Sequence, residues 1–289
     1  MQDSAPLHRI YQVTSIGRPL DPAWPSNRAV MFLMPAAALA GFAFALLGGM
    51  PVLAGLRVAA VFALAVFGTW ALARELLPDD HVASFVSMGL GFMTALAYLT
   101  PGLLVLFTTL GLVRIVNRST GLKARTSDSI VVTCLLIWTV YATESPWFGM
   151  VGAVAFFLDG VLVKPQKKQW LFSLLCFGCM VVYIVDHDVD WWLVLVPDVL
   201  LEWLAVLALL MFALSLFLLK KVHSRGDTDH VRLDVERVKA GMGIAILATL
   251  QGLEVMPQVA LLVATIGGLC LGIAFRRAFR SPVKGLRAG

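Results

Sequence analysis

The chain has few charged residues and few cysteines. Only 14% of its 289 residues are charged, against about 25% in typical soluble proteins. Hydrophobic residues make up 59%, and the mean hydropathy is +0.85. A water-soluble fold of this size could not bury so much apolar surface, which excludes an ordinary soluble enzyme. The composition predicts an all-α, polytopic transmembrane helical bundle.

Cysteine chemistry and cofactor motifs are scarce as well. The four cysteines lie inside apolar segments, so no disulfide framework is expected. Cys176 and Cys179 form a C-x-x-C pair, but thiols in an apolar helix pack as small hydrophobic side chains. No P-loop, H-E-x-x-H, G-x-S-x-G or dinucleotide motif occurs. We therefore expect no cofactor. The N-terminus also lacks the apolar run and cleavage site of a signal peptide.

Apolar segments follow a polar N-terminal tail at residues 1–28. A spanning helix needs ~20 apolar residues, with a range of ~17–25, so the shorter segments must use flanking polar residues to cross. The sequence predicts about ten spans in five hairpins over 29–275, followed by a basic tail at 276–289. The ten segments are 29–48, 52–73, 82–99, 101–113, 129–142, 147–163, 169–185, 191–219, 240–253 and 257–275.

Positive charge is predicted to lie on one side of this bundle. All but one of the 23 lysines and arginines fall in the two tails or in the loops on that side, and Arg57 is the exception. The positive-inside rule then predicts that both termini are cytoplasmic, in the cell's inner or plasma membrane. The basic loops should attract anionic lipid headgroups. The pI of 9.2 therefore does not indicate a nucleic-acid partner.

The loop 114–128 is the longest polar break in the first two thirds of the chain. Its guanidinium groups could hold a phosphate or a carboxylate in a bidentate fork. Arg74 and Asp159, which belong to neighbouring segments, are expected to lie near this loop. Alternatively, these charges serve only topology and mutual pairing. The candidate anion-binding residues are Arg74, Arg114, Asn117, Arg118, Arg125, Asp128 and Asp159.

Two groups of acids are candidate metal ligands. Asp79 and Asp80 form an adjacent carboxylate pair on the cytoplasmic side, as a magnesium ion would need. Asp186, His187 and Asp188 on the opposite side could bind a divalent cation. The alternative for this second group is a solvated turn, because a metal site needs ligands that converge.

Three polar residues lie in or near the predicted spans. Glu202 is inside a span, where an ionised group is expensive and needs a partner. Arg57 is the cation on that side, so the two could form a structural pair or contact a solute. Gln251 belongs to the small polar content expected near the membrane midplane.

These features favour a small-solute transporter or channel. In span count, length and cytoplasmic termini the chain resembles ten-helix drug/metabolite-type permeases. Two inverted halves would place the short segments 101–113 and 240–253 at corresponding positions. One alternative is a membrane-embedded enzyme that acts on a phosphate-bearing lipid at the cytoplasmic face, although the aspartate signatures of such enzymes are not met. Another is a non-catalytic membrane assembly protein.

Overall fold

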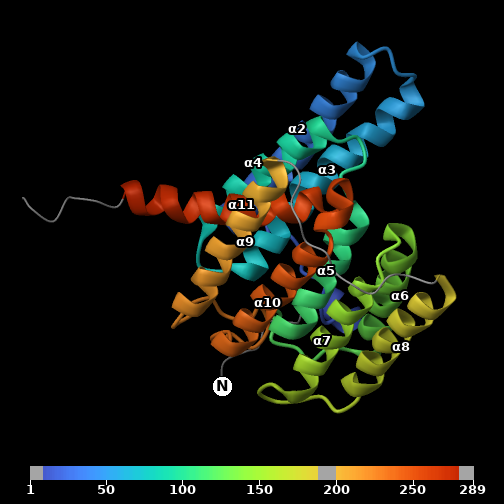
Figure 1. The fold of residues 1–289 in the computed structure, drawn as a ribbon. Helices are drawn as coiled ribbons and strands as arrows, with labels where there is room; N and C mark the ends of the chain where they lie inside the picture. Colours follow the sequence, from blue (N-terminus) through green and yellow to red (C-terminus); the bar gives the residue numbers. More distant parts are fainter. Residues whose placement is uncertain (1–8, 188–199, 280–289) are drawn as a thin grey trace, which may run out of the picture.

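A computed structural model describes residues 9–187 and 200–279 (Figure 1). Within these ranges the chain is helical and has no β-strand, and an isolated bridge joins Arg225 to Arg232. Ten long helices follow the short helix α1 (Ile10–Val13), and each predicted apolar segment overlaps one of them, although residues 191–199 of the eighth segment lie outside the described residues. The ten are α2 (Pro25–Leu47), α3 (Val52–Leu76), α4 (His81–Ala97), α5 (Leu103–Asn117), α6 (Thr126–Thr143), α7 (Trp147–Val161), α8 (Gln169–His187), α9 (Leu200–Leu218), α10 (Val235–Gln251) and α11 (Met256–Phe279), the last preceded by the 3-10 turn η1 (Leu253–Val255).

Six of the described helices are long and apolar enough to cross a membrane, namely α2, α3, α6, α8, α9 and α11. The chain is therefore an integral membrane protein built as a helical bundle. The helices α5 and α7 have 15 residues each. At 1.5 Å per residue such a helix is about 22 Å long, which is shorter than the ~30 Å hydrocarbon core.

The short helix α5 lies in the centre of the bundle. Most of its side chains are buried, and it packs against α3, α6, α7, α10 and α11. Longer helices lie at the periphery and expose apolar side chains, such as Leu39 of α2, Leu174 of α8 and Leu210 of α9. A helix enclosed by protein has no need to match the lipid thickness, because its neighbours shield its ends.

Small residues allow α4 and α11 to approach closely. A Cβ on Gly268 would lie 2.3 Å from the Cα of Ser87, and one on Gly272 would lie 2.3 Å from the Cα of Ala83. The Ser87 hydroxyl donates a 2.9 Å hydrogen bond to the carbonyl of Thr265. Such small-residue contacts are the usual way in which helices associate in a membrane.

The packing repeats only in part between the two halves of the chain, since α2 packs along α3 and the equivalent α7 packs along α8. In the first half α3 packs along α4, whereas in the second half the corresponding helices α8 and α9 share no extended contact over their described residues. The equivalent helices α5 and α10 do pack against each other. The helix contacts therefore match an inverted repeat only in part.

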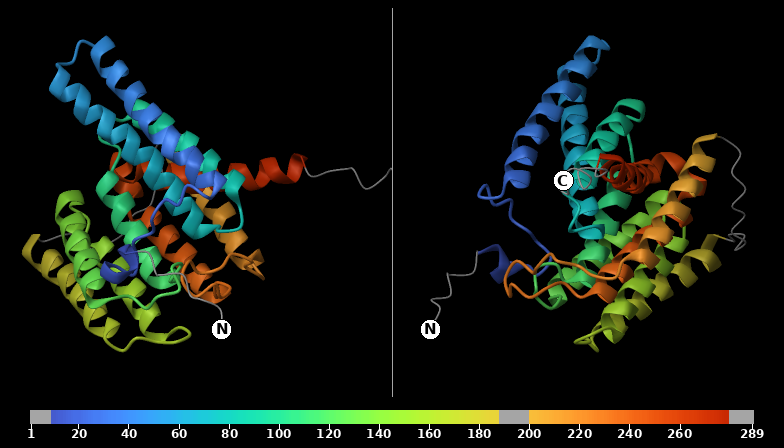
Figure 2. Two further views of the ribbon diagram at one scale, coloured as in Figure 1. Left: turned by 180° about the vertical axis from the view of Figure 1, so that it is seen from behind. Right: turned by 90° about the vertical axis from the view of Figure 1, so that its left-hand side faces the viewer.

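The loops predicted to be cytoplasmic gather at one end of the bundle. The N-terminal segment, the α7–α8 turn and the start of α10 lie at the lower end in Figure 1, away from the α2–α3 turn. In Figure 2 the loop between α9 and α10 runs beside the N-terminal segment. Backbone hydrogen bonds from Asp227 and Thr228 to Ser119 and Thr120 fix this loop on the α5–α6 loop.

The start of α10 differs from the predicted boundary at residue 240. The helix begins at Val235, because the Asp234 carboxylate caps it by accepting a hydrogen bond from the backbone N–H of Arg237. Arg237 is buried in the first turn. Hydropathy places the boundary too late, because it cannot recognise a charge that is paired inside the protein.

Candidate functional site

Glu75, near the end of α3, is the first of two buried carboxylates at the charged end of the bundle. Its Oε1 atom accepts hydrogen bonds from Arg18 Nη1 at 3.2 Å and Arg114 Nε at 3.1 Å. The Glu75 side chain is 1% exposed. A buried carboxylate is tolerated only with such partners. The contact ties α3 to α5 and to the N-terminal segment.

Arg18 extends the contact to the loop between α9 and α10. It binds Asp227 in a bidentate fork, with Nε to Oδ2 and Nη2 to Oδ1 both at 2.7 Å. Burial lowers the pKa of Arg18, but the charges of Glu75 and Asp227 outweigh burial and raise the pKa above its usual value. Arg18 therefore stays charged at every physiological pH.

Tyr11 adds a hydroxyl to the same group. Its OH donates to Asp227 Oδ2 at 3.2 Å. Burial and the charge of Asp227 raise the pKa of Tyr11 to about 12. The phenol thus remains a hydrogen-bond donor across the physiological range.

Asp159 of α7 is the second buried carboxylate, and none of its surface is exposed. Its Oδ1 atom accepts from Arg118 Nε and Arg237 Nη1, each at 2.8 Å. Arg118 ends α5 in a left-handed conformation, with φ of 51°. Asp159 thus links α5, α7 and α10.

Both arginines also hold backbone carbonyls of the α7–α8 turn. Arg118 Nη1 donates to the Lys164 carbonyl at 2.8 Å, and Arg237 Nη2 donates to the Val163 carbonyl at 2.6 Å. We call the whole set the ion-pair cluster. Its members are Arg18, Glu75, Arg114, Arg118, Asp159, Asp227 and Arg237.

Asn117 lies between the two carboxylates. Its Nδ2 donates to the backbone carbonyl of Glu75 at 2.9 Å. A Cβ on Gly241 would lie 2.2 Å from the Asn117 Oδ1, so α10 approaches α5 this closely only because residue 241 is glycine. Three buried acceptor atoms, Asn117 Oδ1, Glu75 Oε2 and Asp159 Oδ2, accept no hydrogen bond from the described residues.

The N-terminal segment is held on the α5–α6 loop by Asp128. This carboxylate accepts from the hydroxyls of Thr14 and Ser15 and from the Ser15 backbone N–H at 2.7 Å. Arg125 Nη2 donates to the Tyr11 carbonyl at 3.1 Å. Asp128 and Arg125, both predicted to contact an anionic ligand, bind the chain's own N-terminal segment here.

The predicted magnesium pair faces two different partners. Asp79 accepts from the Ser224 hydroxyl at 2.7 Å and from the backbone N–H groups of His223 and Ser224, both at 2.8 Å. Asp80 caps α4 through the Ala83 N–H and pairs with Arg276 at 3.2 Å. These acids therefore join loops and helix ends in this structure, and the described residues contain no cluster of three metal-ligating side chains.

Asp79 has a perturbed titration. Partial burial would raise the pKa of this carboxyl, but the hydrogen bonds from Ser224 and His223 outweigh burial and lower the pKa below its ordinary value of 3.8. Arg74, nearby at the end of α3, donates to the Pro78 carbonyl at 3.2 Å and contacts His81. Arg74 is not a member of the ion-pair cluster.

Of the candidates predicted on the opposite side, two contact each other. His187 pairs with Asp186 at 3.5 Å and stacks on Tyr183. Asp188 lies outside the described residues. Arg57 is exposed on α3, and no ion pair joins it to Glu202, although both side chains are described.

The helices α5 and α10 pack against each other, and the polar side chains near their contact are bonded within the protein. Thr108 of α5 shares a 2.9 Å hydrogen bond with Thr139 of α6, and the Thr249 hydroxyl donates to the Ala245 carbonyl within α10. Gln251, at the end of α10, is half-buried. Neither of the two pockets that the described residues form most clearly lies along this contact.

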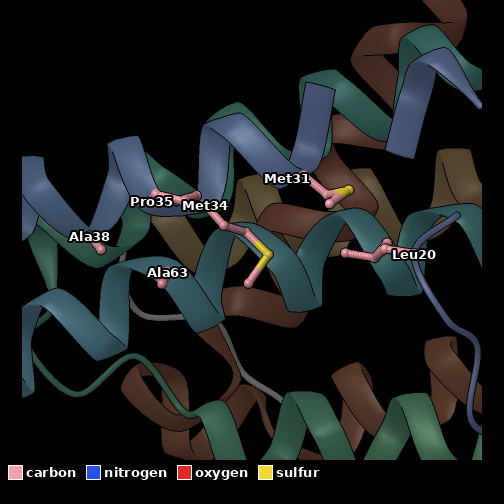
Figure 3. Close-up of a pocket in the computed structure, with 6 residues that line it drawn as sticks. All are labelled: Leu20, Met31, Met34, Pro35, Ala38 and Ala63. Carbon is pink, nitrogen blue, oxygen red and sulfur yellow. The ribbon is translucent and has the colours of Figure 1, made fainter. Parts of the chain in front are cut away.

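The first pocket is an apolar groove of about 360 Å³ between α2 and α3 (Figure 3). In Figure 3 the Met34 side chain extends from α2 toward Ala63 of α3, and Leu20 approaches from the N-terminal segment. The lining residues carry no polar side chain. This groove has no group that could orient a polar solute.

The second pocket is a cleft of about 510 Å³ between the α7–α8 turn and the α9–α10 loop. Its cations are Lys164, Lys221 and Arg232, and we call it the basic cleft. The prediction of an anion-binding loop at 114–128 overlooked these three residues. Arg18, Glu75, Asp227 and Arg237 of the ion-pair cluster were overlooked as well, although an acid at the end of an apolar segment, such as Glu75, is a signal for a buried pair.

The function of this membrane protein has to be argued from its own residues. Comparison of the chain with protein-family models, with curated protein sequences and with solved structures gave no match.

Proposed function

We propose that the protein is a transporter or channel for small solutes, and that the ion-pair cluster is the gate at its charged end. The observation that supports this most directly is the pair of buried carboxylates, Glu75 and Asp159. Each is shared by two arginines that come from different elements. The cluster thus connects α3, α5, α7 and α10 with the N-terminal segment.

A buried ion pair is a poor device for stability alone. The cost of removing two charges from water often exceeds their attraction, and apolar residues of similar volume commonly give an equally stable core. A better-attested use of such groups is to specify one arrangement among several, as in a register or a switch. One oxygen of Glu75 and one of Asp159 accept no hydrogen bond from the described residues. Contacts that are incomplete in this way can separate more readily than interlocked apolar side chains.

The gate would control the seam between α5 and α10. Glu75 and Asp159 lie at the charged end of this seam, and Asn117 fills the space beside Gly241 there. Further along, the polar side chains of the two helices are uncharged, with Thr108, Thr109 and Thr249 among them. An uncharged lining suits a neutral or weakly polar solute. The structure then corresponds to the closed state of the gate.

The two alternatives have less support from the contacts. An enzyme for phosphate-bearing lipids would need available carboxylates, and Asp79, Asp80, Asp128 and Asp159 are each engaged by protein groups. In an assembly protein the cluster would only maintain the arrangement of the helices and would not open. Loss of the charges should then leave the seam closed.

Cysteine accessibility tests the gate. In a variant whose four native cysteines are replaced by serine or alanine, Ala248→Cys would place a thiol at a fully buried position of α10. A membrane-impermeant maleimide should label it slowly in vesicles that expose the charged end. Adding Glu75→Gln should speed labelling about tenfold or more.

The matched control is Glu236→Gln, because Glu236 is an exposed acid at the same end of the bundle. It should leave the labelling rate unchanged. If the Glu75→Gln protein is folded and residue 248 stays as protected as in the parent, the cluster is not a gate and the assembly alternative is favoured.

A further inference from the structure

The basic cleft contains cations that form no ion pair with the residues that the structure describes. Lys164 comes from the α7–α8 turn, whereas Lys221 and Arg232 come from the α9–α10 loop. All three are exposed, and none forms an ion pair with another described residue. Asp234 also lines the cleft, where its carboxylate caps α10 by accepting from the backbone N–H of Arg237, so the lining carries three cations and one carboxylate.

The cleft is also amphipathic. Its remaining lining side chains are apolar, namely Val163, Val222, Val231, Leu233 and Val235. Val163 and Val231 are each 56% exposed. Lysines beside exposed valines offer one surface for an anion and another for the hydrocarbon next to it. A free inorganic anion would use only the first.

The position of the cleft, like its lining, suits a lipid headgroup. It lies just beyond Val161, where α7 ends, and close in sequence to Leu218, where the membrane-length helix α9 ends. This is the level at which lipid headgroups meet a membrane protein. A volume of about 510 Å³ is within the usual range of ligand pockets, about 300–1,000 Å³.

We propose that the basic cleft binds the phosphate-bearing headgroup of an anionic membrane lipid. Lys164, Lys221 and Arg232 hold the phosphate, and the exposed Val163 and Val231 contact the glycerol and the first methylenes of the acyl chains. The site does not depend on the proposed transport function.

The cleft shares a wall with the ion-pair cluster. The carbonyls of Val163 and Lys164 accept hydrogen bonds from Arg237 and Arg118, the two arginines that hold Asp159. A lipid seated on the side chains of this turn stiffens the same backbone. If the cluster acts as the proposed gate, a bound headgroup favours its closed arrangement, and this consequence alone rests on the proposed function.

Binding can be measured with the purified full-length chain in a zwitterionic detergent. Dioctanoyl phosphatidylglycerol, added at about a hundredfold excess over its Kd, should raise the midpoint of thermal unfolding by roughly 5–10 °C, because it binds the folded state alone. Dioctanoyl phosphatidylcholine should raise it by less than about 2 °C. Sodium phosphate at the same concentration should also raise the midpoint by less than about 2 °C, because it lacks the apolar part of the lipid.

Two triple variants locate the site. Lys164→Gln, Lys221→Gln and Arg232→Gln together should remove most of the shift. Arg28→Gln, Lys123→Gln and Lys167→Gln remove the same charge from exposed positions outside the cleft and should keep it. Should the first triple variant fail to fold, the three single variants are measured, and each should weaken the apparent affinity about threefold or more.

Three outcomes would overturn the proposal. Equal losses in the two triple variants would mean that the anion is attracted by the general charge of this face. A full shift with sodium phosphate alone would assign the cleft to a free anion rather than a lipid. Equal shifts with phosphatidylcholine would show that the negative charge is not recognised.

Discussion

The ion-pair cluster and the basic cleft lie side by side at the charged end of the bundle, but they use positive charge in opposite ways. In the cluster, four arginines face three carboxylates, and both Glu75 and Asp159 are buried. In the cleft, three exposed cations have no carboxylate partner among the described residues. The first region therefore holds the protein together, and the second is available to what lies outside it.

The positive-inside rule would count both regions alike. The rule predicts the side on which cations lie, because it reflects how a chain is inserted. It does not distinguish Arg118, which is paired with Asp159 inside the protein, from Arg232, which forms no ion pair with a described residue. Only the contacts of each side chain separate the two roles, and substitutions in the two regions test that separation.

The largest effect is expected from Asp159→Ala. It leaves Arg118 and Arg237 buried without their carboxylate, which should cost about 3–5 kcal/mol of the free energy of unfolding. Arg232→Ala in the basic cleft should change it by no more than about 0.5 kcal/mol. Thermal or denaturant unfolding in detergent measures both. Similar losses in the two variants would contradict the difference between the regions.

A smaller effect on stability is expected when the second carboxylate and both its arginines are replaced together. Asp159→Leu, Arg118→Met and Arg237→Met remove every charge of this group, so no unpaired ion remains. The free energy of unfolding should stay within about 1 kcal/mol of the parent or rise. Residue 248 should then stay protected from maleimide even in the presence of Glu75→Gln.

That combination tests whether the charged residues are needed to stabilise the closed structure or to let it open. A protein that is stable and permanently closed would show that the charges serve a switch. A large loss of stability would show instead that they are needed for the closed structure itself.

The smallest effect concerns Asp79, which belongs to neither region but joins the same loops. Its pKa is lowered in the folded protein, so its contribution to stability is present above its ordinary pKa of 3.8 and is lost as the pH falls through the lower folded value. The backbone N–H groups of His223 and Ser224 should then lose protection from hydrogen exchange, after correction for intrinsic exchange rates. Asp79→Asn should reduce this protection at neutral pH and remove its pH dependence, with no effect on solute uptake.

The sequence predicts the helices well because each depends on local information. Over the described residues every apolar segment contains a helix, and the boundaries fail mainly where charge is involved. The start of α10 is the clearest case, since Asp234 caps the helix and Arg237 is buried in its first turn. The cap could have been recognised from an aspartate before a helical segment, but the burial of an arginine could not.

The candidate site was harder to predict because its partners are far apart in sequence. Asp128 was identified as a ligand-binding candidate, yet its partners Thr14 and Ser15 lie in a segment interpreted as a free tail. Asp79 and Asp80 have the composition of a metal pair, but the backbone directs one to a loop and the other to a helix end. Pairing between distant loops depends on the tertiary fold, which no local pattern records.

The separation of Arg18 from Asp227 by 209 residues has a consequence for biosynthesis. Arg118 can reach Asp159 once α7 is made, but Asp227 and Arg237 emerge only after α9 has entered the membrane. The nascent chain therefore keeps its charged end incomplete until the ribosome has translated most of the message. A polypeptide halted before residue 227 would lack both the carboxylate that Arg18 binds and the second arginine of Asp159.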